Sequence, residues 1–297
     1  MADDKKTVVA LGMFDGVHIG HKKLIDTAVL IAKARGLIPV VYTFSNHPQE
    51  LLGNRVARLC SNEDRRGYLK ALGVQYIDMV DFTAKICSSR PKAFVDMLIS
   101  RLNPEVLVAG FNYTFGMKKS GTAEMLEKLA NARGVDVAII NPVLVGKQPV
   151  SSTRIRELIE KGDVAKAQLM LGRTHNLSGT VVRGRGIGKQ LSYPTANIKI
   201  DAPLVLPADG VYVTYLETDG SIFPAVTNVG NNPTVGGSEK GIETHILDFD
   251  GELYGRFVRV RFVKRLRGEK RFGSLDELRN QIATDVRDAN HYFGKDV

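Results

Sequence analysis

The 297-residue sequence has few cysteines and lacks any long apolar run. Its two cysteines, Cys60 and Cys87, do not have the spacing of a metal site, and so few cysteines are typical of a reducing compartment. The apolar runs are too short to cross a membrane as a helix. Residues 1–6 are charged and lead directly into a predicted strand, which argues against a signal peptide. We therefore expect a cytoplasmic protein, and the length favours two domains.

Clusters of positive charge are also missing, although the chain is basic overall. The formal net charge is +9, from 41 basic and 32 acidic residues. Residues 1–173 hold 25 basic and 17 acidic residues, and residues 174–297 hold 16 and 15, so the excess lies in the first part. The bases are scattered, and no alternation of basic and aromatic residues resembles a platform for single-stranded nucleic acid. Small phosphate-bearing molecules are the better prediction for the ligands.

A strand, a glycine-rich loop and a helix follow one another near the start of the chain. Apolar residues 8–11 predict the strand, glycines punctuate residues 12–20, and a helical pattern then opens. His18 and His21 are three residues apart, which predicts that both lie on the first turn of this helix and on one face. Metal ligation or a plain surface position is the alternative, but no further ligand nearby in the sequence is placed to help. With the free N–H groups of the helix start, the pair suits the phosphate of a nucleotide under attack.

Strands and helices alternate through the rest of the first part. This alternation predicts a parallel sheet with helices on both faces, in which ligands lie at the carboxyl ends of the strands. Strands are expected at residues 37–44, 74–80, 105–109 and 135–140, and helices near residues 61–73, 89–102 and 121–133.

Two segments leave the carboxyl ends of predicted strands and have chemistry of their own. Residues 110–116 hold three aromatic side chains and one amide, which could stack on and hydrogen-bond to a planar ring; a buried aromatic turn is the alternative. Residues 151–156 place hydroxyls and arginines at a helix start, which is typical of an anion site. Simple N-capping by serine would explain the hydroxyls equally.

The pattern changes near residue 173, where we place a domain boundary that gives domains 1–173 and 174–297. The second part has short β-rich segments separated by turns, and residues 274–291 predict a final amphipathic helix. This spacing predicts an antiparallel barrel or sandwich. The β-rich segments are residues 179–182, 210–216, 222–229, 241–249 and 256–266.

The second part holds two candidate sites. Residues 184–190 are not a P-loop, because Gln190 follows the lysine and Pro194 bars an early helix; they are better read as a flexible flap over phosphates. The oxygens of Thr195 and Asn197 could share one Mg²⁺ ion, although a polar turn is the default. Glu243 shares a strand face with His245, and beside a barrel mouth it could act as a general base. A solvated strand carboxylate is the alternative.

These motifs together resemble a known family. Residues 12–21 (GMFDGVHIGH) resemble the H-x-G-H signature of the nucleotidylyltransferase superfamily, and in particular the start of the bacterial bifunctional riboflavin kinase/FAD synthetase family. Residues 110–116 (GFNYTFG) and 151–156 (SSTRIR) are similar to two further motifs of that family. A collinear set resembles its riboflavin kinase domain: residues 194–197 (PTAN), 210–212 (GVY), 228–234 (NVGNNPT), 243–249 (ETHILDF), 253–255 (LYG) and 266–272 (LRGEKRF).

The resemblance implies an enzyme that phosphorylates riboflavin to FMN with ATP and then joins FMN to AMP, with release of pyrophosphate. It implies His18 and His21 as catalytic residues of the adenylyl transfer, and Glu243 as the base for the 5′-hydroxyl of riboflavin. For the first domain it implies nucleotide-binding Gly12, Phe14, Asp15, Gly20, Ser152, Thr153 and Arg156, and flavin-binding Phe44, Asn112 and Tyr113. For the kinase it implies nucleotide-binding Gly184, Gly186, Lys189, Thr195 and Asn197, the last two also holding Mg²⁺.

The sequence departs from the family pattern at three positions. Lys189 replaces an arginine of the flap and Ser192 replaces its second glycine, so the planar guanidinium fork is lost and the backbone is restricted. Asn46 stands where the family often has proline. The alternatives are an adenylyltransferase with a weak or inactive kinase domain, a non-catalytic flavin or nucleotide sensor, and nucleic-acid binding through the basic strand 256–266. We expect small-molecule partners only, with no nucleic acid or membrane; the sequence makes no prediction of oligomeric state.

Overall fold

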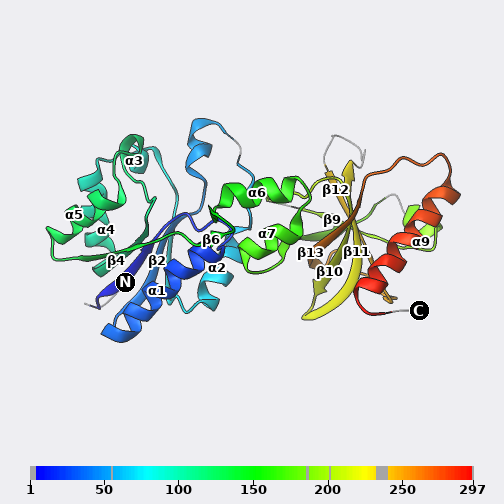
Figure 1. Cartoon of the computed structure of the whole chain (residues 1–297), viewed down its shortest axis with the longest axis horizontal. Helices are drawn as coiled ribbons and strands as arrows, with labels where there is room; N and C mark the ends of the chain where they lie inside the picture. The colour runs from blue at the N-terminus through cyan, green and yellow to red at the C-terminus, as the bar shows by residue number, and fades with distance from the viewer. Residues whose placement is uncertain (1–4, 55, 185–186, 201, 232–239, 296–297) are drawn as a thin grey trace. The chain divides into compact units, whose positions relative to one another are not determined.

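The computed structural model describes residues 5–54, 56–184, 187–200, 202–231 and 240–295. The chain forms two compact units, Met1–Ser152 and Thr153–Val297. Figure 1 colours the first unit from blue to green and the second from green to red. Each unit has its own hydrophobic core, so each is described by itself.

The first unit is built on a parallel sheet of five strands in the order β3-β2-β1-β4-β5. This confirms the predicted α/β architecture. The strands are β1 (Thr7–Leu11), β2 (Ile38–Phe44), β3 (Tyr76–Val80), β4 (Pro104–Gly110) and β5 (Asp136–Ile140). The helices are α1 (Ile19–Arg35), α2 (Asn62–Ala71), α3 (Ala84–Cys87), α4 (Pro91–Leu102) and α5 (Ala123–Asn131), with 3-10 turns at Pro48–Leu52 and Met117–Lys119 and a small hairpin of β6 (Leu144–Val145) and β7 (Gln148–Pro149).

Both faces of this sheet are covered by helices, as the apolar strands predict. Successive residues of a strand point to opposite faces. Val9 and Leu11 of β1 therefore pack in a core with α4 and α5, while Val8 and Ala10 pack in another with α1 and α2. Because the strands are parallel, the carboxyl ends of all five lie at the same end of the sheet. The loops that follow the strands surround this end (Figure 1).

Local sequence signals set the ends of the first helices. Gly36 adopts a left-handed conformation with φ 68° and ends α1, and the Ser61 side chain accepts a hydrogen bond from the Asp64 N–H to begin α2, both as expected. One detail of the prediction was wrong. His18 precedes α1 as its N-cap, because its ring accepts a hydrogen bond from the His21 N–H, so only His21 lies in the first turn.

The second unit is a closed antiparallel barrel of six strands in the order β10-β11-β12-β9-β8-β13. This confirms a barrel and excludes the sandwich. The strands are β8 (His175–Val182), β9 (Ala196–Lys199), β10 (Gly210–Thr218), β11 (Ser221–Asn231), β12 (Lys240–Ile246) and β13 (Phe257–Gly268). The helices are α6 (Ser152–Glu160), which begins at the last residue of the first unit, α7 (Val164–Leu171), α8 (Ile187–Gln190) and the predicted final helix α9 (Leu275–Tyr292).

The barrel wall has an inner and an outer face, and the strand alternation decides which residues lie on each. Ile242 and Ile246 of β12 pack inside the barrel, whereas α9 packs on the outside through Val286 and Ala289. A buried chain of hydroxyls, Thr214–Thr227–Thr244, joins three strands inside, with oxygen–oxygen distances of 2.8 and 2.9 Å. Glu243 and His245 therefore lie on the outer face, as the alternation predicts.

The structure contains short elements that the sequence did not predict, among them α3 and the hairpin of β6 and β7. The short strand β9 was not predicted, and residues 187–190 of the expected flap form the helical turn α8. The compact units divide after Ser152, about twenty residues before the predicted boundary at residue 173. The reason is that α7 packs on the barrel, where Val164 joins the core.

Candidate active sites

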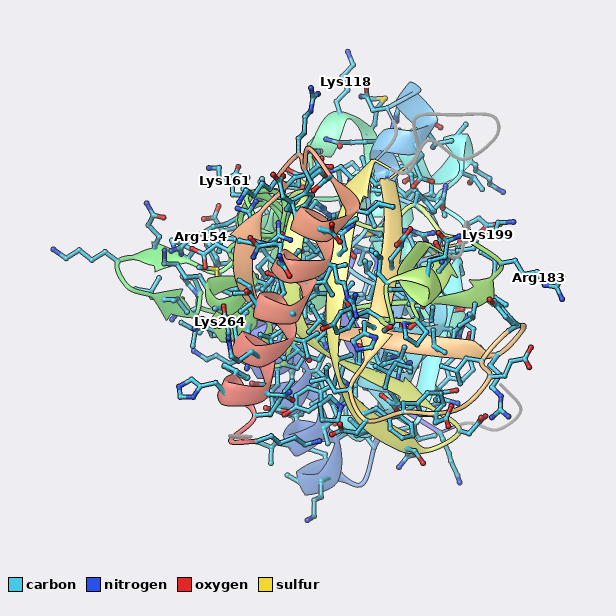
Figure 2. All side chains as sticks on the ribbon, turned by 90° about the vertical axis from the view of Figure 1, so that its right-hand side faces the viewer. Lys118, Arg154, Lys161, Arg183, Lys199 and Lys264 are labelled. Atoms are coloured by element: carbon cyan, nitrogen blue, oxygen red, sulfur yellow. The ribbon has the colours of Figure 1, made fainter. Side chains whose placement is uncertain are left out.

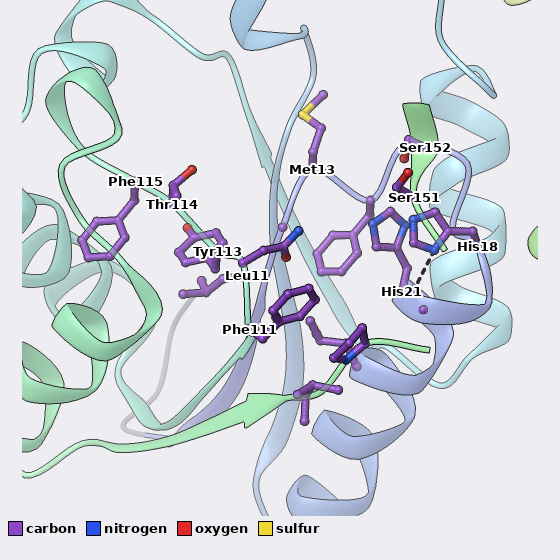
Figure 3. A pocket seen from close by; sticks show the side chains of 18 of the residues that line it. Leu11, Met13, His18, His21, Phe111, Tyr113, Thr114, Phe115, Ser151 and Ser152 are labelled. Carbon is purple, nitrogen blue, oxygen red and sulfur yellow. Dashed lines mark hydrogen bonds between the residues drawn. The ribbon is translucent and has the colours of Figure 1, made fainter. Parts of the chain in front are cut away.

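A cavity of about 450 Å³ opens at the carboxyl edge of the sheet in the first unit. Its walls come from the loop after β1, the start of α1, the ends of β2 and β4, and residues 140–152. Figure 3 shows His18, His21, Ser151 and Ser152 at one end and Tyr113, Thr114 and Phe115 at the other. Predicted site residues that line it are Gly12, Phe14, His18, Gly20, His21, Phe44, Asn112, Tyr113 and Ser152.

The two histidines form a stacked pair at the start of α1. Their ring centroids are 3.6 Å apart and the planes differ by 14°. Nδ1 of His18 accepts a hydrogen bond from the His21 N–H at 3.2 Å, so the ring proton of a neutral His18 lies on Nε2. The ring of Phe14 meets His21 edge-on at 5.3 Å. The pair is therefore held in one orientation, with Nε2 of His18 as a hydrogen-bond donor.

The loop between β1 and α1 has an unusual backbone. Phe14 and Val17 have φ of 50° and 39°, in the left-handed region that side chains other than glycine rarely adopt. A Cβ atom on Gly12 would lie 2.9 Å from the ring of Phe14, so the glycine is needed for the ring to pack there. Backbone outliers of this kind cluster at functional sites, which fits the position of this loop at the cavity.

Side chains from distant segments hold this loop in place. The buried guanidinium of Arg65 donates to the carbonyl oxygens of Met13 at 2.7 Å and Phe44 at 2.6 Å. Burial lowers the pKa of Arg65 from its ordinary value. The carboxylate of Asp15 is also buried and accepts the N–H of Leu59 at 2.9 Å, while the Ser152 hydroxyl donates to the Asp15 carbonyl at 3.0 Å. In this structure Asp15 thus shapes the loop.

The other end of the cavity is aromatic. Phe44 and Phe82 meet edge to face with centroids 4.9 Å apart, and Tyr113 stacks with Phe115 at 5.7 Å. Burial raises the pKa of the Tyr113 phenol, which keeps its proton. The amide of Asn112 is exposed beside them. An end with π-faces and one amide can hold a planar, polar-edged ring system.

Asn46, at the position where the family often has proline, makes a side-chain bridge to the end of β3. Its Oδ1 accepts the N–H of Phe82 at 2.7 Å, and its Nδ2 donates to the carbonyl of Phe82 at 3.2 Å. The bridge fixes the residue that packs on Phe44 in the cavity wall. In this chain the asparagine side chain thus holds the segment after β3 by a pair of hydrogen bonds.

Thr153 and Arg156 lie in α6, within the second compact unit. Arg156 follows Ser152 by four residues, so the two lie on one face of this helix. Both Thr153 and Arg156 stay predicted ligands on the strength of their motif.

A second cavity, of about 330 Å³, lies against the outer face of the barrel and beneath α9. It is lined by Asn228, Glu243 and His245 of the barrel wall, and by Tyr193 and Thr195. The structure thus places Glu243 on the outer face of the barrel wall, in a cavity that residues of α9 also line. Glu243 is half-buried, which differs from a fully solvated strand carboxylate.

The strand register brings Glu243 and Asn228 of this second cavity together with Asn197 beside it. Glu243 pairs directly with Asn197 of β9 on one side and with Asn228 of β11 on the other. Directly opposite residues in antiparallel strands point to the same face, so the carboxylate lies between two amides. Thr195 is two residues before Asn197 in the chain, so an extended backbone places it toward the same face.

The predicted flap is partly described. A Cβ atom on Gly184 would lie 2.2 Å from Nδ2 of Asn197, and one on Gly188 would lie 2.4 Å from the carbonyl oxygen of Tyr193. Both glycines thus permit close packing against residues 193–197. Gly186 and residues 232–234 lie outside the described residues, and of Lys189 only the backbone, within α8, is described.

Helix α9 is held to the barrel beside this cavity by a partly buried ion pair. Arg267 of β13 donates from Nε and from a terminal nitrogen to the two oxygens of Asp285, at 2.9 and 2.7 Å. Gln281 donates to the same carboxylate at 3.1 Å. Arg267 and Asp285 both line the cavity, so this bidentate contact sets the distance between its two walls.

The basic strand β13 does not present a cationic surface. Arg259 and Arg261 both form ion pairs with Glu217, and Arg256 pairs with Asp219. Figure 2 shows Lys264 on one side of the view and Lys199 and Arg183 on the other. This arrangement disfavours the nucleic-acid alternative.

Two negative findings apply to the part of the chain that the structure describes. No group of three or more histidine, cysteine, aspartate and glutamate side chains there is placed to hold a metal ion. No helix formed by those residues has the length and apolar character needed to cross a bilayer.

Each of the two units holds a cavity lined by candidate catalytic groups, and comparisons with known proteins show that the chain is a two-domain transferase of phosphorus-containing groups. The family model of FAD synthetases matches residues 1–154, and that of riboflavin kinases matches residues 171–293. The chain belongs to the family of bifunctional riboflavin kinase/FMN adenylyltransferases.

Relatives with this name are similar over nearly their whole length. The Bacillus subtilis protein is 34% identical over 98% of this chain and 94% of its own. The Escherichia coli K12 protein is 34% identical over 99% of this chain and 95% of its own. A solved structure titled a macrolide-efflux protein from Streptococcus pneumoniae is 35% identical, with a TM-score of 0.91 over 98% of this chain and 95% of that one.

Several residues of the two sites were missed by sequence reasoning. Arg65 supports the first cavity through contacts with segments far away in the sequence, and it had no signal. Asn228 and Arg267 stand in the motifs 228–234 and 266–272 and line the second cavity, but they had no assigned role. Gly188 and Tyr193 lie in the flap, where the sequence pattern predicted no defined structure. The glycine at position 188 was a usable signal, because it stands beside a lysine in a segment that folds back on itself.

Proposed function

We propose that this chain phosphorylates riboflavin to FMN and adenylylates FMN to FAD, with ATP as the substrate of both steps. The observation that carries the proposal is that each segment matched by one family model holds a cavity with the groups its reaction needs. One cavity has an imidazole pair and an aromatic end, and the other has a half-buried carboxylate between two amides.

For adenylyl transfer, we assign the phosphates of ATP to the end with His18 and His21. There a phosphate oxygen of FMN attacks the α-phosphorus of ATP, and the bond to pyrophosphate breaks. Donors held in place at that end stabilise the charge that builds up on the α-phosphate. Phe44, Asn112 and Tyr113 would hold the isoalloxazine ring, and Ser152, Thr153 and Arg156 the leaving phosphates, with Gly12, Phe14 and Gly20 shaping the loop around the nucleotide.

For the kinase, we assign Glu243 as the group that accepts the proton of the 5′-hydroxyl of riboflavin. The hydroxyl oxygen then attacks the γ-phosphorus of ATP and ADP leaves. The amides of Asn197 and Asn228 flank the carboxylate and can orient it by hydrogen bonding. Thr195 and Asn197 would bind the nucleotide, covered by the flap with Gly184, Gly186 and Lys189.

The residues of the kinase cavity fit a Mg²⁺ ion that arrives with ATP. Mg²⁺ prefers oxygen ligands and keeps waters and phosphate oxygens, so a hydroxyl and an amide from Thr195 and Asn197 suffice without a cluster of carboxylates. The ion would neutralise charge on the transferred phosphate. The two free cysteines are compatible with a cytoplasmic location.

The experiment is to incubate the purified chain with riboflavin, ATP and Mg²⁺ and to separate FMN from FAD by chromatography over time. We expect FMN first and FAD afterwards. FAD from added FMN, without FMN from riboflavin, would indicate an inactive kinase domain. Flavin binding without either product would indicate a sensor. The domain assignments, residues 1–173 for the adenylyltransferase and 174–297 for the kinase, are tested by which variants affect which product.

A further inference from the structure

His245 contacts the two residues that precede Thr195 in the chain. Its Nδ1 lies 2.8 Å from the carbonyl oxygen of Pro194, and its ring meets the ring of Tyr193 edge-on with centroids 5.5 Å apart. His245 also lies two residues after Glu243 on the same face of β12, and both line the kinase cavity. One side chain thus connects the strand that carries the proposed base to the segment that carries a proposed nucleotide ligand.

The strand register explains why a side chain is needed here. Strands β12 and β9 pair through Glu243 with Asn197 and Thr244 with Ala196. Continuing that register would bring Ile246 opposite Pro194, but proline has no N–H to donate to a ladder. The main-chain pairing stops, and the ring of His245 makes a hydrogen bond to the carbonyl of Pro194 instead. The histidine thereby extends the contact between the two strands beyond their last main-chain pair.

The partner of this ring nitrogen decides the tautomer. A carbonyl oxygen can only accept, so Nδ1 of His245 carries the proton that it donates. In a neutral imidazole, Nε2 is then an acceptor.

The hydrogen bond fixes more than one atom. The peptide bond between Pro194 and Thr195 is planar, so holding its oxygen also sets the direction of the Thr195 N–H and Cα. From the other side, the Tyr193 N–H donates to the carbonyl of Gly188 at 2.8 Å. Residues 193–195 are therefore held between α8 and β12.

We propose that His245 is a positioning residue of the kinase site, which keeps Thr195 on the wall of the cavity by holding the Pro194 carbonyl. The side chain acts through this peptide and touches neither the transferred phosphate nor the attacking hydroxyl. The proposal rests on the kinase function proposed for this cavity.

Two variants separate the two contacts of this ring. In His245→Asn the amide nitrogen takes the place of Nδ1, so the donor is kept and the ring is lost. In His245→Phe the ring contact with Tyr193 is kept and the donor is lost. We expect His245→Phe to raise the KM for ATP in FMN formation about threefold to tenfold, the range of one hydrogen bond, with kcat near native. His245→Asn should stay within about twofold, and both variants should adenylylate added FMN at the native rate.

The tautomer gives a readout that does not depend on turnover. The chain has six histidines, and comparing ¹⁵N NMR spectra of the native protein and His245→Asn assigns the ring signal of His245. We expect the neutral ring to be protonated at Nδ1. Protonation at Nε2 instead would overturn the proposal, because the Pro194 carbonyl would then have no donor.

The kinetic outcomes are equally decisive. Equal losses in the asparagine and phenylalanine variants, or native KM values in both, would overturn the positioning role. Glu243→Gln distinguishes this failure from a failure of the kinase assignment itself. If Glu243→Gln stops FMN formation while the His245 variants behave alike, only the positioning role is wrong.

Discussion

His18 and His21 occupy different places although three residues separate them. His18 is buried and caps α1 with its ring, whereas His21 lies in the first turn and stacks on it. The cap has a direct consequence for chemistry, since it occupies Nδ1 of His18 and leaves Nε2 as the donor. The N–H groups at the start of α1 and the Nε2 donor of His18 thus face one region of the cavity. Such a set of donors favours the binding of an anion.

Arg156 provides a test at the scale of one residue. If its guanidinium makes a bidentate contact with the phosphates of ATP, Arg156→Ala should raise the KM for ATP in adenylylation by about tenfold or more. Arg156→Lys should restore the KM only in part, because an ammonium lacks the planar fork. The measurement is the initial rate of FAD formation from FMN at varied ATP, with Arg154→Ala as the control that should stay near native. Full rescue by lysine would mean that net charge alone matters at this position.

Sequence motifs predicted which residues belong to the two sites, but they did not predict which other residues those side chains contact. Asp15 was predicted to bind the nucleotide, and the structure has its carboxylate on the N–H of Leu59, 44 residues away. Arg65 had no signal, because its partners are carbonyl oxygens at the ends of two strands. Contacts of this kind depend on the packing of distant segments, which no local pattern encodes.

At the scale of elements, the long and strongly apolar strands were predictable and the short polar ones were not. Every strand of the parallel sheet was found. In the central strands β1, β2 and β4, burial on both faces leaves a mostly apolar run. Strand β9 has four residues, two of them polar, directly after a proline and a threonine. Only its pairing with β8 and β12 makes it a strand, and that pairing is set by closure of the barrel.

The packing of α8 gives a prediction for the kinase. A Cβ atom on Gly188 would lie 2.4 Å from the Tyr193 carbonyl oxygen, which is backbone and cannot move aside cheaply. Gly188→Ala should therefore displace residues 193–195 and lower FMN formation about tenfold or more, while FAD formation from FMN stays native. Both rates are measured on the same preparation.

Gly67→Ala is the matched control. Gly67 lies in α2, and a Cβ atom there would meet nothing within 4 Å, so the change should leave both activities intact and stabilise the helix by up to about 1 kcal/mol. A Gly188→Ala variant with native FMN formation would show that the turn can shift without affecting the site.

His175 of β8 gives a prediction about stability and pH. Its ring is buried, Nε2 lies 3.0 Å from the Val205 carbonyl oxygen, and burial lowers the pKa of His175 from 6.5 to about 4. Between these values the unfolded chain binds a proton that the folded chain does not. The free energy of unfolding should therefore fall as pH drops from about 6.5 to about 4, by about 3 kcal/mol from this group.

His175→Gln isolates this contribution, because the glutamine amide nitrogen can donate to Val205 in place of Nε2 and does not titrate. Urea unfolding of both proteins across this pH range is the measurement. The native protein should lose stability relative to the variant as pH falls. Parallel curves for the two proteins would contradict the assignment.

At the scale of the whole molecule, the two units differ in architecture, in core and in the chemistry of their cavities. The change of pattern along the chain predicted two domains, but the compact units divide after Ser152 because α7 packs on the barrel. A helix at a domain boundary has the same hydrophobic pattern whether it packs on the domain before it or on the domain after it. The compact units thus report a change in packing, and the functional boundary at residue 173 stays a prediction.

The central claim is that each of the two candidate sites carries one of the two activities. The most direct test is to measure FMN formation from riboflavin and FAD formation from added FMN in two variants, His21→Ala and Glu243→Gln, under saturating ATP. We expect His21→Ala to lower FAD formation by about 10²–10³ and to leave FMN formation native. Glu243→Gln should lower FMN formation by about 10²–10⁴, with native riboflavin binding and native FAD formation. Parallel loss of both activities in either variant, or native FMN formation in Glu243→Gln, would contradict the account.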